Sequence, residues 1–148
     1  MPTVVEIADL LERRANGDFG AADDVWADEV TVWRNGSQSE FQVPGKQRNE
    51  RTRAELEVLQ TAMPDFHTES IVHVDEAASV IIEFATWSGH TVRIPGSAVE
   101  GEYHRFVQCF IYLVENGKIT HIDVYDDAAT GRRWNELMTH TRLLKLVQ

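Results

Sequence analysis

The clearest alternation of hydrophobic and polar positions lies between residues 102 and 127, where two aromatic and β-branched runs flank Asn116-Gly117. Both residues of an Asn-Gly pair accept the positive φ of a type I′ turn, so the pattern predicts a β-hairpin with a two-residue loop. The loop fixes the expected cross-strand pairs, which are Glu115 with Lys118, Tyr112 with His121, Phe110 with Asp123, and Gln108 with Tyr125.

This register predicts two unlike faces, because side chains alternate across a strand. One face would carry aromatic rings with an amide, an imidazole and a carboxylate set among them: Gln108, Phe110, Tyr112, His121, Asp123 and Tyr125. The other would be almost purely apolar: Val107, Cys109, Ile111, Leu113, Ile122 and Val124. A carboxylate among aromatic side chains is costly unless it is paired or used, so Asp123 is the first candidate for chemistry.

Helical periodicity dominates the N-terminal part of the chain. Thr3 and Glu6 form a capping box before an apolar stripe that ends at Asn16-Gly17. A shorter helix is predicted over 21–27, burying Val25 or Trp26. A strand over 29–36 and a short returning strand follow, closed by Pro44-Gly45, and a charged helix over 47–62 ends before Pro64.

Strand patterns dominate the second half. Residues 66–75 and 79–87 are predicted to be strands, and 90–99 a loop or a loose extension around Pro95-Gly96. A last helix is predicted over 127–138, and residues 140–148 continue or restart it. With the hairpin, the four later strands form an antiparallel meander. Helices before and a sheet after predict an α+β fold with three helices on one face of a curved sheet, followed by a C-terminal helix. The 148 residues fit a single domain, 1–148.

The composition argues against several classes of partner and binding site. A net charge of −10 without a free-standing basic cluster argues against nucleic acid and against anionic membranes. One cysteine excludes an internal disulfide and a cysteine zinc site and fits a reducing compartment, so we expect a cytoplasmic protein. No apolar stretch reaches membrane-spanning length, and no histidine pair has ligand spacing, so neither a metal nor a cofactor is expected.

The order of predicted elements, Met63-Pro64-Asp65-Phe66 and the closing GKITHIDVYDD segment together resemble the nuclear-transport-factor-2-like cone fold. Within that fold the chain is similar to the SnoaL-like polyketide cyclases and the limonene epoxide hydrolases, over nearly its whole length. The resemblance implies a cone-shaped, antiparallel or mixed sheet wrapped around three helices, with a hydrophobic pocket at the open end. The fold hosts enzymes, carriers and dimerisation modules, so it does not decide the activity.

The resemblance also suggests roles for single residues. Asp123 stands at the water-activating base of the epoxide hydrolases, and Asn35 matches the Asn of their Tyr-x-Asn element, with Trp33 in place of the Tyr. Their acidic Arg-x-Asp pair has no counterpart, since Phe84 and Thr86 stand there. Epoxide opening would then lack an evident proton donor. The ketosteroid isomerase branch fits less well, while SnoaL-like cyclases imply only one carboxylate on the last strand.

We therefore expect a small lyase, isomerase or cyclase of SnoaL-like type acting on an apolar, carbonyl-containing molecule. Asp123 would be the general base, assisted by His121, and the substrate would contact Asn35, Trp33, Tyr112, Gln108, Phe110 and Phe84. One alternative is a non-catalytic ligand-binding or dimerisation module. Another is a water-adding hydrolase that takes its acid from His90 or His104.

Three points stay open in the sequence. Asn35 before Gly36 is also typical of a turn. If Val30 and Val32 face the core, Trp33 points away from the pocket. The apolar hairpin face predicts a homodimer, unless the C-terminal residues Leu143, Leu144, Leu146 and Val147 cover it.

Overall fold

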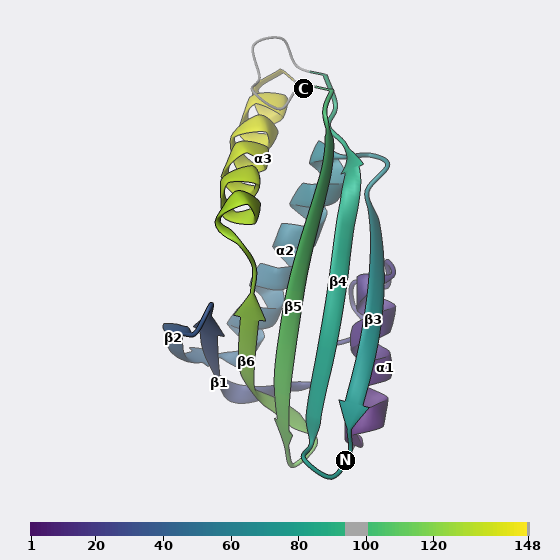
Figure 1. Cartoon of the computed structure of the whole chain (residues 1–148), viewed down its shortest axis with the longest axis vertical. Coiled ribbons are helices and arrows are strands. Elements are labelled where there is room, and N and C mark those ends of the chain that lie inside the picture. Colours follow the sequence, from purple (N-terminus) through teal and green to yellow (C-terminus); the bar gives the residue numbers. More distant parts are fainter. Residues whose placement is uncertain (94–100, 148) are drawn as a thin grey trace.

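The computed structural model describes residues 1–93 and 101–147 and has three helices and six strands within them. The helices are α1 (Val4–Ala15), α2 (Gly45–Ala62) and α3 (Ala128–Val147). The strands are β1 (Trp26–Arg34), β2 (Ser37–Pro44), β3 (His67–Asp75), β4 (Val80–His90), β5 (Tyr103–Glu115) and β6 (Lys118–Tyr125). Figure 1 shows α1 and α2 behind a long sheet, with α3 beside its upper part. The predicted α+β class is confirmed.

All six strands belong to one sheet in the order β2-β1-β6-β5-β4-β3. The predicted meander of β3 to β6 is antiparallel throughout. Strand β1 pairs in parallel with β6 and antiparallel with β2, so the sheet is mixed. This arrangement brings the end of β1 next to the end of β6, although the two are some ninety positions apart in sequence.

Helix α1 forms as its sequence predicts. The Thr3 hydroxyl accepts a hydrogen bond from the Glu6 amide at 3.1 Å, and the Glu6 carboxylate accepts one from the Thr3 amide at 2.9 Å. These bonds satisfy N–H groups that a helix start leaves without partners. Ile7 and Leu11 are fully buried in the main core, which also contains Tyr112.

The helix predicted over 21–27 is wrong. Residues 21–24 form a turn and β1 begins at Trp26, although Val25 and Trp26 are buried as expected. The Ile119 amide donates to the Val25 carbonyl at 2.7 Å, and Trp26 pairs with Ile119. A sheet neighbour thus satisfies this backbone, whereas a single isolated helical turn is unfavourable to nucleate. The loop predicted around Pro95-Gly96 lies outside the described residues.

The hairpin register holds at the turn and then shifts. Glu115 pairs with Lys118 as predicted, but an irregularity between Leu113 and Val114 displaces the remaining pairs. Beyond it, Tyr112 faces Ile122, Phe110 faces Val124, Ile111 faces Asp123, Leu113 faces His121, and Cys109 faces Tyr125. An extra residue in one strand moves every later side chain to the opposite face. The predicted pairing of Phe110 with Asp123 is therefore wrong.

The bulge decides which hairpin residues enter the core. Ile122 and Val124, predicted on the outer apolar face, are 1% and 0% exposed and belong to the main core. A second cluster joins α2, α3 and β5 through Leu59, Ala62, Met63, Phe106 and Leu137. Among the described residues, no helix is both long enough and apolar enough to cross a membrane.

Candidate functional site

A cavity of about 370 Å³ opens between α2, α3 and the inner face of β5. Its walls are mostly aromatic and aliphatic: Leu56, Leu59, Trp87, Phe106, Phe110 and Trp134. Polar groups gather toward the ends of β1 and β6, where Arg34, Gln108 and Asp126 line the cavity. An apolar enclosure with a few convergent polar groups is the usual form of a small-molecule site.

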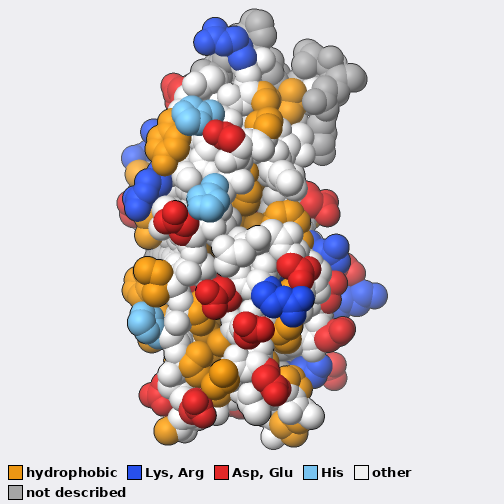
Figure 2. Space-filling view, turned by 90° about the vertical axis from the view of Figure 1, so that its right-hand side faces the viewer, with side chains coloured by type: hydrophobic (Ala, Val, Ile, Leu, Met, Phe, Trp, Pro, Cys, Tyr) orange, Lys and Arg blue, Asp and Glu red, His pale blue; other side chains and the backbone are white. Residues whose placement is uncertain are grey.

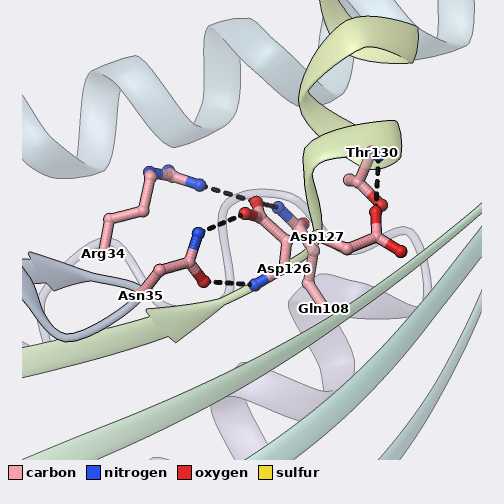
Figure 3. A network of polar contacts seen from close by, with 6 residues as sticks. All are labelled: Arg34, Asn35, Gln108, Asp126, Asp127 and Thr130. Carbon is pink, nitrogen blue, oxygen red and sulfur yellow. Dashed lines mark hydrogen bonds and ion pairs between the residues drawn. The ribbon is translucent and has the colours of Figure 1, made fainter.

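Asp126 is the most strongly held carboxylate of this cavity (Figure 3). Its Oδ2 accepts hydrogen bonds from Arg34 Nη1 at 2.7 Å and from Gln108 Nε2 at 3.1 Å. Its Oδ1 accepts one from Asn35 Nδ2 at 3.1 Å. The side chain is 9% exposed. A carboxylate offers about four acceptor positions, so these three donors leave room for about one more partner.

The turn after β1 places two of these donors. Asn35 and Gly36 have φ of 52° and 80°, a left-handed pair that lets the chain reverse directly after Arg34. The Asn35 amide donates to the Val124 carbonyl at 2.8 Å, and the Asn35 side-chain oxygen accepts from the Asp126 amide at 2.9 Å. Asn35 is thus a turn residue and also a contact of the cavity carboxylate.

The first strand presents Arg34, not Trp33, to the cavity. Val30 and Val32 are 0% and 1% exposed, so the core lies on their side of β1, and Arg34 shares that side. Trp33 lies on the opposite face, with its ring centroid 6.5 Å from that of His121. The expectation that Trp33 lines the cavity is not met.

His121 and Asp123 lie together on the outer face of the sheet. His121 Nε2 is 3.0 Å from Asp123 Oδ1, and the side chains are 23% and 29% exposed. Neither side chain is among those lining the cavity, because the bulge turns both away from Phe110. Phe84 is also on the outer face, at 47% exposure. The catalytic role assigned to His121 and Asp123 stays a prediction, and it would need a separate site on this face.

The two other histidines considered are also away from this cavity. The exposed His90 binds Asp65 through its backbone amide and its ring, each at 2.7 Å, and the amide bond first and the ring second hold the pKa of Asp65 below its usual range. His104 is 1% exposed and stacks on Phe106 at 6.3 Å between ring centroids. Within the described part of the chain, no group of three or more His, Cys, Asp or Glu is placed to hold a metal ion.

The carboxylate that does lie among aromatic rings is Glu83. It is 4% exposed, pairs with Phe110 across β4 and β5, and accepts a hydrogen bond from the Tyr112 hydroxyl at 3.4 Å. Burial raises the pKa of Glu83, and the nearby positive charge of Arg14 offsets part of that rise. The sequence signal for Glu83 is an acid inside the otherwise apolar run SVIIEFATW.

A smaller cavity of about 40 Å³ continues inward from the first. The two share Arg48, Thr52, Leu56, Trp87 and Phe110 as lining residues. Beyond them the smaller cavity is bounded by Leu11, Arg14, Ala15, Trp26, Glu83, Tyr112 and Ile122. Tyr112, expected as a substrate contact, therefore lies at this inner end and not at the wall of the main cavity.

The charge of the main cavity differs from that of the chain. Its described lining residues include three arginines, Arg34, Arg48 and Arg51, and two carboxylates, Glu55 and Asp126. Arg51 Nε lies 3.4 Å from Glu55 Oε1. The whole chain has a net charge of −10, and Figure 2 shows carboxylates spread over the lower half of the face on the β3 and α1 side. The cavity is thus locally biased toward an electron-rich ligand.

The curved mixed sheet and its covering helices define the nuclear-transport-factor-2-like fold class, and the cavity has the form of a small-molecule site. The model of the SnoaL-like polyketide cyclase family matches residues 6–133, so the chain belongs to that family. No curated protein sequence matches the chain significantly.

Solved structures support the fold. A protein from Acidithiobacillus ferrooxidans described as a polyketide cyclase is 18% identical, with a TM-score of 0.62 over 90% of this chain and 95% of that one. PrhC from Penicillium brasilianum is 17% identical, with a TM-score of 0.60 over 96% and 93%. A SnoaL-like protein from Mesorhizobium loti is 22% identical, with a TM-score of 0.55 over 84% and 99%. At these identities the likeness establishes the fold alone.

Proposed function

We propose that the chain is an enzyme of cyclase or isomerase type that removes a proton next to a carbonyl group, with Asp126 as its general base. The observation that carries this proposal is the nearly buried Asp126 carboxylate at the polar end of an aromatic-walled cavity. Family membership supports the reaction class. The base proposed here lies three positions after the Asp123 expected from the sequence, because Asp123 is turned to the outer face.

The lining favours an apolar, ring-bearing substrate with an electron-rich oxygen. Trp87, Phe106, Phe110 and Trp134 offer flat surfaces on which rings pack. Arg34 and Gln108 lie at the same end as Asp126, since both donate to it. A substrate carbonyl placed there would have donors close to the base, as enolate formation needs.

The proposed step is a simple proton transfer. An Asp126 oxygen takes the proton from the carbon beside the carbonyl, the C–H electron pair becomes the enolate π bond, and the negative charge moves to the carbonyl oxygen. Arg34 and Gln108 would stabilise that oxygen. The same proton then returns to another carbon in an isomerisation. In a cyclisation the enolate carbon attacks a second carbonyl, whose π electrons move to its oxygen, and that oxygen takes the proton from Asp126. A positioned base contributes about 10²–10⁴ in rate.

Hydrogen exchange tests the proposal without knowledge of the natural substrate. The bicyclic ketone 2-tetralone has acidic protons beside its carbonyl, and in D2O each enolisation replaces one of them with deuterium. We expect the protein to accelerate this exchange, measured by proton NMR, and Asp126→Asn to remove the acceleration. Exchange at the buffer rate with the unaltered protein, despite binding of 2-tetralone, would contradict the enzymatic proposal.

That outcome would favour the alternative, a ligand-binding module that uses the same cavity without chemistry.

A homodimer through the outer sheet face is part of the proposal, supported by the exposed apolar side chains Ile71, Phe84, Val107 and Leu113. A cytoplasmic location stays a prediction from the single cysteine.

A further inference from the structure

The smaller cavity contains buried polar atoms that the proposed reaction at Asp126 does not use. Glu83 is 4% exposed, and its Oε2 makes no hydrogen bond of ordinary geometry among the described residues, although the Ser70 hydroxyl lies near enough to help lower the pKa of this carboxyl. Arg14 is 6% exposed, and its Nη1 likewise has none there. Trp87 borders both cavities, and its buried indole N–H also has no hydrogen-bond partner among the described residues.

Such atoms are costly to leave without a partner. A buried donor or acceptor that lacks a partner costs about 1–3 kcal/mol, and more if it is charged. Native proteins therefore satisfy nearly all of them with protein, water or ligand. Here Arg14 and Glu83 both line one small cavity, so one ligand oxygen bound there could serve a guanidinium nitrogen and a carboxyl oxygen.

We propose that this cavity, between Arg14 and Glu83, is a subsite that binds a hydroxyl group of the ligand whose carbonyl end lies near Asp126. The inference rests on the proposed function for the occupancy of the main cavity and adds the group recognised at its inner end. The volume of about 40 Å³ is large enough for a hydroxyl group or a water molecule, since a cavity needs about 10–15 Å³ to hold a water.

A hydroxyl group fits this pair better than other small groups do. It accepts a hydrogen bond from Arg14 and donates one to Glu83, so both orphan atoms gain a partner. A methoxy group can accept but cannot donate, and it is larger. A water molecule can fill the space in the empty protein, and a ligand hydroxyl that replaces it reproduces both of its hydrogen bonds.

The subsite also has the rigidity that recognition needs. Glu83 is held by the Tyr112 hydroxyl on its other oxygen, and Arg14 lies over the Trp26 ring at 5.4 Å from the ring centroid. A site whose polar groups are already positioned loses little entropy on binding and rejects ligands that leave those groups unpaired.

Two matched pairs of rigid probes test the subsite. The first pair is 6-hydroxy-2-naphthoate and 2-naphthoate, which place a carboxylate at the arginine-lined end and differ only in the far hydroxyl. The second pair is 2-naphthol and naphthalene, which lack the anionic group. Quenching of tryptophan fluorescence gives the dissociation constants. A fifth probe, 6-methoxy-2-naphthoate, can accept a hydrogen bond at the far position but cannot donate one.

We expect the hydroxylated member of each pair to bind about tenfold more tightly, the value of one well-formed buried hydrogen bond to a charged group. Glu83→Leu should remove this preference. The double variant Arg14→Met with Glu83→Leu should remove it as well while leaving no unpaired charge buried, so it guards against a loss that merely reflects misfolding. Glu69→Leu, on the exposed face of β3, should keep the preference.

The outcomes separate the subsite from the proposed function. Equal binding within both pairs, or no binding of any probe, overturns the subsite. A hydroxyl preference that persists in the double variant overturns it too, because the recognition would then lie elsewhere. If 2-naphthol is preferred over naphthalene while neither naphthoate binds, the subsite stands and the electron-rich ligand of the proposed function does not.

Discussion

The Tyr112 hydroxyl donates a hydrogen bond to Glu83 Oε1 across β5 and β4, with 3.4 Å between the two oxygens. Both side chains are almost fully buried, at 2% and 4% exposure. Burial raises the pKa of each group, and their mutual proximity raises that of Tyr112 further. Burial therefore shifts Glu83 toward its protonated form, although Arg14 and the hydrogen bond from Tyr112 both lower its pKa, and the net rise fixes how its contribution to stability depends on pH.

The first prediction is that Glu83→Gln makes the protein more stable at neutral pH and flattens its pH dependence. The folded pKa of Glu83 lies above the unfolded value of about 4.3. Below that value both states hold the proton, and no penalty exists. As the pH rises, the unfolded chain releases its proton first, so stability falls until the folded pKa is reached. Each unit of pKa difference costs about 1.4 kcal/mol.

Urea unfolding between pH 4 and pH 8 measures this dependence. The stability gained by Glu83→Gln should grow across the interval, because glutamine has no proton to lose and still accepts from Tyr112. Glu69→Gln, at an exposed carboxylate, is the matched control and should track the unaltered protein. A constant offset between Glu83→Gln and the unaltered protein at every pH would show that Glu83 is not perturbed.

The second prediction separates the two candidate bases. Asp126→Asn should lower the rate of 2-tetralone exchange by about 10²–10⁴, the range of a general base. Asp123→Asn should leave the rate within about twofold, because its side chain lies on the outer face with His121. Proton NMR in D2O gives both rates, and thermal unfolding verifies that both variants fold. The reverse result would place the chemistry on the outer face, as the sequence first indicated.

Much of the fold could be predicted because its signals are local. Thr3 and Glu6 predict the start of α1, and Asn116-Gly117 predicts the turn between β5 and β6. Both depend on hydrogen bonds or backbone angles within a few residues. The register beyond the turn is not local, since it depends on whether Ile122 and Val124 or His121 and Asp123 pack better against α1 and the rest of the core.

The bulge near Leu113 is the consequence of that competition. It buries Ile122 and Val124 and turns Asp123 outward, and the residues at the bulge carry no glycine or proline that would mark it. The sequence does not predict Asp126 as a site residue for a related reason. Its partners Arg34 and Asn35 come from a strand about ninety residues earlier, and only the parallel pairing of β1 with β6 brings them together.

The third prediction concerns the start of α2. Gly45 lies so close to β1 that a Cβ atom there would collide with the Ala27 carbonyl oxygen and press on the Trp26 side chain. Gly45→Ala should therefore destabilise the protein by about 2 kcal/mol or more, as overpacking in a buried position does. Gly131→Ala is the control, because its Cβ would meet no atom within 4 Å inside α3.

Alanine in place of an exposed helical glycine should stabilise by about 0.5–1 kcal/mol. Chemical denaturation of both variants measures the change in the free energy of unfolding, which should be a loss for Gly45→Ala and a gain for Gly131→Ala. Equal effects at Gly45 and Gly131 would mean that the close approach of α2 to β1 relaxes at little cost. Activity is not the readout here, since Gly131 borders the cavity.

The last prediction is a homodimer through the outer face of the sheet. Ile71 and Phe84 are 63% and 47% exposed and pair with each other across β3 and β4, and Val107 and Leu113 extend the apolar surface along β5. Soluble monomers rarely keep a large contiguous apolar patch on the surface. A two-fold contact would cover it with the same residues from each chain. The C-terminal helix is a weaker candidate for the cover, since its Leu137 packs with Phe106 on the inner side.

Sedimentation velocity of three proteins tests this contact. The unaltered chain should run as a dimer, and Phe84→Lys combined with Val107→Lys should run as a monomer, because each dimer would bury four lysines without partners. Val5→Lys, at a 46% exposed position of α1, should remain dimeric and shows that an added lysine alone does not dissociate the chain. If the unaltered chain is a monomer, the dimer is wrong. If all three are dimers, the contact lies elsewhere, and the outer pair His121 and Asp123 stays open to ligands in the assembled protein.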